Sequence, residues 1–293
     1  MLFSTDNGGP IYNNGTAGAN NYPLRGGKMN NWDGGIRGNG FISGGKLPPS
    51  RRGVKHQGMT TAWDWYATFS AFAGVDPTDH RAAAAGLPPI DSVDHSAMIM
   101  GTNLSHARLE LPIGTEPRAS TNAGAKPCGS YHPSSDRWSR RMNRALGRHG
   151  YPLMFQGGGP PPAANDTCTT LSGLIWDEGK AGLWKLLTGD VQQDMFTGPH
   201  YPNSSTDEVS NNFVGHCGSG CLFNLLDDPL EKHDFAHDAA HAARLQAMTA
   251  RLNALAATAF NPDRGVVDPL ACDKSMKPVS DGGYGDFWGW WIE

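Results

Sequence analysis

The stretch LSGLIWDEGKAGLWKLL, residues 171–187, decides the fold of the second half of this chain. Two apolar runs, 171–176 and 182–187, flank a polar segment that contains glycine, 177–181. This pattern is typical of two antiparallel strands joined by a short turn. The stretch therefore predicts a β-hairpin.

A third strand and a long helix are predicted after this hairpin. Residues 221–225 (CLFNL) form another apolar run, which ends at the turn residues 227–229 (DDP). A helix is expected from about 234 to 260, because one face of it would carry Leu245, Met248, Leu252 and Leu255. Antiparallel strands covered by one helix form a small α+β layer.

Short strands are predicted near the start of the chain. Residues 1–5 form a short run that stops at the turn residues 6–9 (DNGG), and 40–44 (GFISG) form a second candidate strand. Asp or Asn followed by Gly-Gly supplies turn hydrogen bonds and positive φ angles. The first strand should therefore end at Asp6.

One helix is predicted in the first half, at residues 61–73. One face of this helix would carry the aromatic side chains of Trp65, Phe69 and Phe72. Thr61 and Asp64 resemble a capping box with Asp in place of Glu, and Gly74 is suited to close the helix. The pattern breaks after this helix, and we place a domain boundary near residue 95.

The composition limits the classes of protein to which the chain can belong. Its 38 glycines and 21 prolines are roughly a fifth of 293 residues, against about 12% in average proteins, so many turns are expected. A formal net charge of −4 excludes a protein built to bind polyanions, and no nucleic-acid partner is expected. No apolar run is long enough to span a membrane, and the first residues lack the pattern of a signal peptide.

Cysteines and glycosylation sequons indicate an oxidising compartment. The five cysteines, none in a CxxC pair, are Cys128, Cys168, Cys217, Cys221 and Cys272. Candidate glycosylation sites are Asn14, Asn103, Asn165 and Asn203. His216 with Cys217 and Cys221 offers an imidazole and two thiolates, but we favour disulfide bonding over a zinc site.

Two further clusters have a functional and a simpler interpretation. His233, His237 and His241 resemble the spacing of a zinc-protease helix, but Asp238 stands where that pattern needs Glu. We therefore favour a solvated first helical turn over a metal site. The aromatic tail at 287–291 (FWGWW) could stack on a sugar, but packing of the tail against a core is favoured.

The most informative polar residues lie within the first 40 positions. Asp6 and Asn7 follow the first predicted strand and offer carboxylate and amide oxygens, the ligands that calcium prefers. Residues 25–28 (RGGK) form a loop whose glycines let the backbone approach an anion, and Lys28 supplies a compact positive charge. Ordinary turn chemistry explains each feature about equally well when it is taken alone.

Taken together and in this order, the segments resemble the type I sulfatases, most closely the arylsulfatase B (N-acetylgalactosamine-4-sulfatase) branch. The resemblance rests on STDNGG at 4–9, NYPLRGGK at 21–28 and WDGGIRG at 32–38. Further matching segments are DWYAT at 64–68, GLWKLLTG at 182–189, CLF at 221–223, DPLEKHD at 228–234 and the tryptophan-rich tail. The resemblance is weak from about 95 to 165.

The resemblance implies an α/β fold of alkaline-phosphatase type, with residues 1–95 as the C-terminal part of the catalytic domain. Residues 96–293 would be a smaller C-terminal subdomain with an antiparallel sheet and one long helix. Asp6 and Asn7 correspond to calcium ligands, and Lys28 corresponds to a contact of the substrate sulfate. In the family, a hydrated formylglycine attacks sulfur while calcium and cations neutralise the sulfate oxygens. The implied substrate is an aryl or carbohydrate sulfate ester, and the implied location is secreted or lysosomal.

The sequence also departs from the family pattern. No Cys or Ser begins a Cys-x-Pro-x-Arg segment, the source of formylglycine, and the Asp-Asp pair that completes the calcium site is missing. The chain thus resembles the C-terminal part of a sulfatase, with an incomplete calcium site, and we expect it to be inactive alone. By the same resemblance, Cys272 should be unpaired because its partner lies in the missing half.

Two other interpretations remain. The main alternative is a non-catalytic binding module, or pseudoenzyme, on a sulfatase scaffold. A phosphoester hydrolase of the same superfamily is the other. An in-frame nucleophile motif upstream of Met1 would separate the sulfatase from the binding module.

Overall fold

The computed structural model describes residues 1–11, 19–114, 171–197, 214–259, 274 and 277–285. The chain divides into two compact units, one formed by residues 1–124 and 169–259 and the other by residues 125–168 and 260–293. In the second unit, the short helix η5 (Val279–Asp281) is closed by Gly282 in a left-handed conformation. The elements below belong to the first unit, and the domain boundary near residue 95 stays a prediction.

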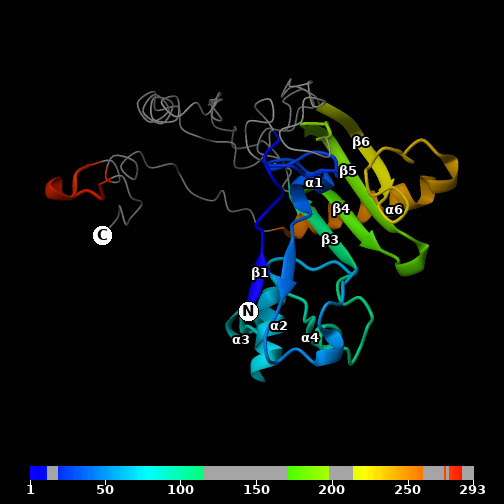
Figure 1. Ribbon diagram of the computed structural model, residues 1–293. Helices are drawn as coiled ribbons and strands as arrows, with labels where there is room; N and C mark the ends of the chain where they lie inside the picture. Colours follow the sequence, from blue (N-terminus) through cyan, green and yellow to red (C-terminus); the bar gives the residue numbers. More distant parts are fainter. Residues whose placement is uncertain (12–18, 115–170, 198–213, 260–273, 275–276, 286–293) are drawn as a thin grey trace. The chain divides into compact units, whose positions relative to one another are not determined.

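A four-stranded antiparallel sheet organises this unit, and it appears in green and yellow in Figure 1. Paired in chain order, its strands are β3 (Glu110–Gly114), β4 (Leu171–Asp177), β5 (Leu183–Gln192) and β6 (Val214–Asn224). The turn between β4 and β5 contains η3 (Gly179–Ala181), which confirms the predicted hairpin. β6 begins well before the apolar run at 221–225, and the sequence pattern does not predict β3.

The two faces of the sheet pack against different parts of the chain. On one face, the helix α6 (Ala242–Thr258) packs its side chains Met248 and Leu252 against the sheet. The sheet residues of this layer are Leu174, Trp184, Leu186 and Leu222. This confirms the predicted apolar face of the helix, since Leu245 and Leu255 pack beside the same layer. On the other face, Trp32 packs against Ile175, Leu187 and Phe223. Because successive side chains of a strand point to opposite faces, Lys185 lies on the Trp32 side.

The long helix starts later than predicted, at Ala242 rather than near residue 234. The carboxylate of Asp234 accepts the amide of Leu222, and the amide of Phe235 donates to the Leu222 carbonyl, both at 2.8 Å. These bonds tie the segment to the sheet and leave it irregular. Asp238 then caps the short turn η4 (Ala239–His241), and α6 follows directly.

A separate two-stranded sheet precedes the first candidate site residues. Both predicted strands are present, and β1 (Leu2–Ser4) pairs antiparallel with β2 (Gly40–Ile42), a pairing that the sequence does not predict. Phe3 and Phe41 stack across the pair with ring centroids 5.2 Å apart. The chain leaves β1 directly before the predicted turn at Asp6.

The other described helices of this unit are α1 (Asp33–Ile36), η1 (Pro49–Arg51), α2 (Asp64–Ala73), α3 (His80–Ala84) and α4 (Ser96–Met100). α2 ends as predicted at Gly74, which takes a left-handed conformation with φ 70°. Throughout the part of the chain that the structure describes, no helix combines the length and apolar character needed to cross a bilayer.

The aromatic face of α2 is not its buried face. Asp64 accepts the amide of Thr61 at 2.8 Å, which is one half of the predicted capping box. The buried residues of the helix are Asp64, Ala67 and Thr68. Phe69 is 44% exposed and stacks on Trp65. The polar face turns inward because Asp64 forms an ion pair with the buried Arg108.

Candidate functional site

The turn after β1 carries Asp6, which is exposed, and Asn7, which is half-buried. The two glycines that follow are fixed by residues from later segments. The Gly8 amide donates to the Gly35 carbonyl at 2.8 Å, and the Gly9 amide donates to the side-chain oxygen of Asn21 at 2.8 Å. These bonds hold the turn in one position.

The loop that contains Lys28 lies directly beside this turn. The Lys28 amide donates to the Gly9 carbonyl at 3.0 Å, and the side chain of Asn21 donates to the same carbonyl at 2.8 Å. Gly26 takes a left-handed conformation with φ 73°, and its amide donates to the Met195 carbonyl at 2.8 Å. The structure thus brings the two predicted segments together through their backbones.

Glycine is required in this contact because backbone packs directly on backbone. A Cβ atom on Gly8 would lie 1.7 Å from the Gly34 carbonyl oxygen, and one on Gly34 would lie 2.3 Å from the Gly26 oxygen. A Cβ atom on Gly27 would lie 2.5 Å from the Gly9 oxygen. The glycine pairs of the three motifs therefore make room for one another.

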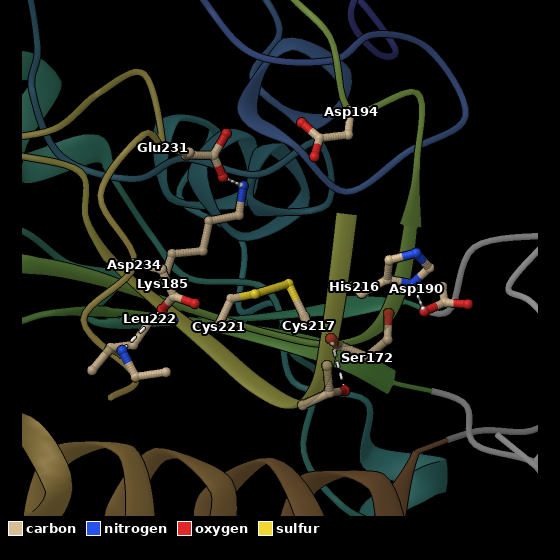
Figure 2. Close-up of a disulfide and its surroundings, with 12 residues drawn as sticks. Ser172, Lys185, Asp190, Asp194, His216, Cys217, Cys221, Leu222, Glu231 and Asp234 are labelled. Carbon is tan, nitrogen blue, oxygen red and sulfur yellow. Dashed lines mark hydrogen bonds and ion pairs between the residues drawn. A yellow bond between two sulfur atoms is a disulfide. The ribbon is translucent and has the colours of Figure 1, made fainter. Parts of the chain in front are cut away.

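The third motif, at 32–38, is fixed by three buried charged side chains, which we call the buried trio: Lys185, Asp33 and Glu231. Lys185 Nζ lies 2.8 Å from Asp33 Oδ1. It also lies 2.6 Å from Glu231 Oε1, an ion pair without hydrogen-bond geometry (Figure 2). Glu231 Oε2 also accepts the backbone amide of Asp33 at 2.7 Å. The trio joins the motif to the sheet.

Burial and charge act on the trio together. Burial alone would lower the pKa of Lys185, but the carboxylates of Asp33 and Glu231 outweigh it and raise that pKa. Burial raises the pKa of Glu231, and the Asp33 carboxylate adds to this effect while Lys185 opposes it. The lysine is therefore charged at neutral pH, and it is the only cation of the trio.

Arg25 fastens the start of the same loop. Its guanidinium stacks over the ring of Trp32, with 3.6 Å between Cζ and the ring centroid. It pairs with Asp194 at 2.6 Å and donates a hydrogen bond to the Glu231 carbonyl. The loop around Lys28 is thus held at both ends.

Asp6 and Asn7 offer two oxygen ligands, whereas calcium takes roughly 6–8. Within the described ranges, no group of three or more His, Cys, Asp or Glu side chains is arranged to hold a metal ion. The residues that the structure describes therefore do not fit a bound calcium ion by themselves.

Cys217 and Cys221 form a disulfide bond, which confirms the interpretation favoured over zinc (Figure 2). Both lie in β6, where a bulge opposite Gly189 brings their Cα atoms to 4.8 Å. His216 instead contacts Asp190 at 2.9 Å.

The three histidines of the zinc-protease-like pattern do not share a helical face. His233 and His237 lie before α6, in the irregular segment. The ring of His241 packs against Trp184 and Phe235, with centroids 4.9 Å apart in each case. The prediction of solvated side chains is confirmed for His233 and His237, which are exposed, but the prediction that they form the first helical turn is wrong, because bonds to the sheet delay the start of the helix.

A buried polar cluster around Asp64 was not predicted. Arg108 contacts both carboxylate oxygens, one at 2.8 Å, and His95 Nε2 lies 3.1 Å from Oδ2. Burial alone would raise the pKa of Asp64. Hydrogen bonds from Arg108, His95 and the amides of Thr61 and Val93 outweigh it and hold that pKa well below its usual range. No local sequence pattern marks this cluster, because its partners are far apart in the chain.

His56 extends the cluster toward the surface. Its ring centroid lies 6.5 Å from that of His95 and 5.9 Å from that of His106. Burial lowers the pKa of His56 to about 4, and electrostatic interactions with His106, His95 and Arg51 add to this.

We expect the free energy of unfolding to fall as the pH is lowered from about 6.5 to about 4. In that window His56 binds a proton in the unfolded chain but not in the folded one, so acidification favours unfolding. His56→Gln should make the free energy of unfolding depend less on pH in this window. The effect should be smaller than for a fully buried histidine, because His56 is partly exposed. Melting temperatures between pH 4 and pH 8 measure the effect.

His80→Gln is the matched control, since the His80 side chain is 79% exposed. It should leave the wild-type profile in place. A His56→Gln profile as steep as that of the wild type would show that His56 is not responsible.

Of the candidate glycosylation sites, the structure describes Asn103. It is exposed, and its side-chain oxygen accepts the amide of Ser105 at 3.0 Å. Some features singled out in the sequence lie outside the described residues: Asn14, Asn165, Asn203, Cys128, Cys168, Cys272 and the aromatic tail.

No protein-family model matches the chain, but known proteins that are similar to it include an arylsulfatase and a sulfatase of solved structure. Over 73 residues the chain is 38% identical to arylsulfatase J of Mus musculus. The aligned stretch covers 25% of this chain and 11% of arylsulfatase J. A solved structure, that of the PsFucS1 sulfatase from Pseudoalteromonas sp., is also similar, with 19% sequence identity and a TM-score of 0.47. This match covers 91% of the present chain and 38% of the PsFucS1 chain. The chain therefore spans well under two thirds of either protein. The sequence similarity to arylsulfatase J is confined to a quarter of this chain.

Proposed function

We propose that this chain is part of an arylsulfatase-type sulfuric ester hydrolase, and that it supplies Asp6, Asn7 and Lys28 to the active site. The observation that carries this proposal is the backbone contact between the turn after β1 and the Lys28 loop. The similarity to arylsulfatase J supports it. The substrate would be an aryl or carbohydrate sulfate ester.

Lys28 would place its ammonium group against the negatively charged oxygens of the sulfate. The hydrogen bond from its amide to Gly9 fixes the backbone of the loop before substrate arrives. A loop whose backbone is already fixed reorganises less when negative charge develops in the transition state. Asp6 and Asn7 are two of the oxygen ligands that calcium would need, and further ligands would come from other residues.

The nucleophile would come from polypeptide outside this sequence, because no Cys-x-Pro-x-Arg segment is present. We therefore expect this chain alone not to turn over 4-nitrophenyl sulfate. The disulfide supports a secreted or lysosomal location for the enzyme.

A non-catalytic binding module on the same scaffold is the second candidate, favoured by the missing nucleophile motif. Sequencing of the transcript upstream of Met1 separates the two. An in-frame Cys-x-Pro-x-Arg segment supports the enzyme, and an in-frame stop codon directly upstream supports the binding module.

In an enzyme that contains this chain, Lys28→Ala should lower kcat/KM for a sulfate ester by about 100-fold, because the cation meets charge on the transferring group. Steady-state kinetics on 4-nitrophenyl sulfate measure the effect. Lys55→Ala removes an exposed lysine outside the site and should leave kcat/KM unchanged. If the two variants were equally active, Lys28 would not be part of the active site.

A further inference from the structure

The buried trio links three segments that are distant in sequence. Asp33 belongs to α1, Lys185 belongs to β5, and Glu231 follows β6. The side chains of Lys185 and Glu231 are fully buried and that of Asp33 is 4% exposed, so the contacts of the trio are shielded from water. Glu231 also has a positive φ of 54°, a conformation that a residue with a side chain adopts only when its surroundings enforce it.

Net stability does not explain a buried lysine at this position. Taking charges out of water costs free energy, and apolar side chains of similar volume often serve a core as well or better. A lysine between two carboxylates does something that an apolar side chain does not, because it fixes where those carboxylates lie. Here one carboxylate belongs to the loop that carries the candidate site.

The position of Asp33 is transmitted to the site through backbone hydrogen bonds. The amide of Gly34, the next residue, donates to the Arg25 carbonyl at 2.7 Å. The carbonyl of Gly35 accepts the amide of Gly8 at 2.8 Å. A shift of Asp33 would therefore move both the start of the Lys28 loop and the turn after Asp6 and Asn7.

We infer that Lys185 is a positioning residue, which anchors the loop of Lys28 and the turn of Asp6 and Asn7 to the four-stranded sheet through Asp33 and Glu231. The anchoring is a property of the folded chain. That it serves sulfate-ester chemistry rests on the proposed function.

Hydrogen exchange followed by mass spectrometry on this chain tests the inference, because it needs no enzymatic activity. In Lys185→Met, peptides covering 5–9 and 24–36 should exchange about 10-fold faster than in the wild type, while peptides from β3 and β4 stay within about 2-fold. Lys180→Met is the matched control, since Lys180 is exposed in the turn of the same hairpin. It should leave all of these peptides unchanged.

Glu231→Gln is the second variant, for use if Lys185→Met does not fold. It removes one charge of the trio and should raise loop exchange by about 3-fold with the sheet unchanged. Unchanged loop exchange, or an equal rise in loop and sheet, would overturn the inference. Failure of the Lys28→Ala prediction would overturn the function and leave the anchoring in place, so the two failures are distinguishable.

Discussion

Gly8→Ala is expected to lower the free energy of unfolding by about 3 kcal/mol, the upper part of the usual range for overpacking. The new Cβ atom would lie 1.7 Å from the Gly34 carbonyl oxygen and 2.7 Å from the Gly34 carbonyl carbon. Both are backbone atoms, so no side-chain rotation relieves the clash. The hydrogen bond from Gly8 to Gly35 would have to break. Chemical denaturation of the chain measures the change.

Gly45→Ala is the control for this experiment. A Cβ atom on Gly45 meets no atom within 4 Å, and the residue is exposed. We expect the free energy of unfolding to stay the same or to rise by about 0.5 kcal/mol, because alanine lowers the conformational entropy of the unfolded chain. If the two variants unfolded at the same denaturant concentration, the close backbone packing between the motifs would be refuted.

Arg108→Met is expected to cost about 3–5 kcal/mol, the range for breaking a buried ion pair by removing one partner. Asp64 is fully buried and would lose its hydrogen bonds to the guanidinium, leaving an uncompensated carboxylate beside His95. The pKa of Asp64 should rise toward its usual value, so part of the loss should be recovered at low pH by protonation. Unfolding curves at pH 7 and at about pH 3, below the usual pKa of an aspartate, measure both effects.

Arg251→Met provides the comparison for Arg108→Met. Arg251 pairs with Glu110 at 2.5 Å, but the two side chains are 44% and 33% exposed. Exposed ion pairs contribute about 0–1 kcal/mol, so this variant should stay close to the wild type at both pH values. A loss as large as that of Arg108→Met would mean that burial does not set the cost.

The hairpin and the apolar face of α6 are predictable from the sequence because local periodicity determines them. Alternating positions of β5 fill two layers, and Met248 and Leu252 follow one face of a helix. The start of α6 is not predictable in this way. Asp234 accepts a hydrogen bond from β6 and Phe235 donates one to it, and these bonds override a pattern that predicts helix.

The candidate site is predictable in part. The order of the glycine-containing motifs marks Asp6, Asn7 and Lys28, and the structure brings their segments together. The sequence contains one indication of the buried trio, which is a lysine between the apolar Trp184 and Leu186 of a buried strand. That signal shows that a partner must exist but does not identify it, because Asp33 lies 152 residues away.

The buried trio also limits which substitutions this chain can accept in the course of evolution. A lineage that replaced Lys185 with an apolar residue would leave two carboxylates facing each other without a cation. The replacement would persist only with a compensating loss of charge at Asp33 or Glu231. These three positions should therefore covary across related sequences. An attempt to graft the Trp-Asp-Gly-Gly loop onto another scaffold would have to carry the lysine and the glutamate with it.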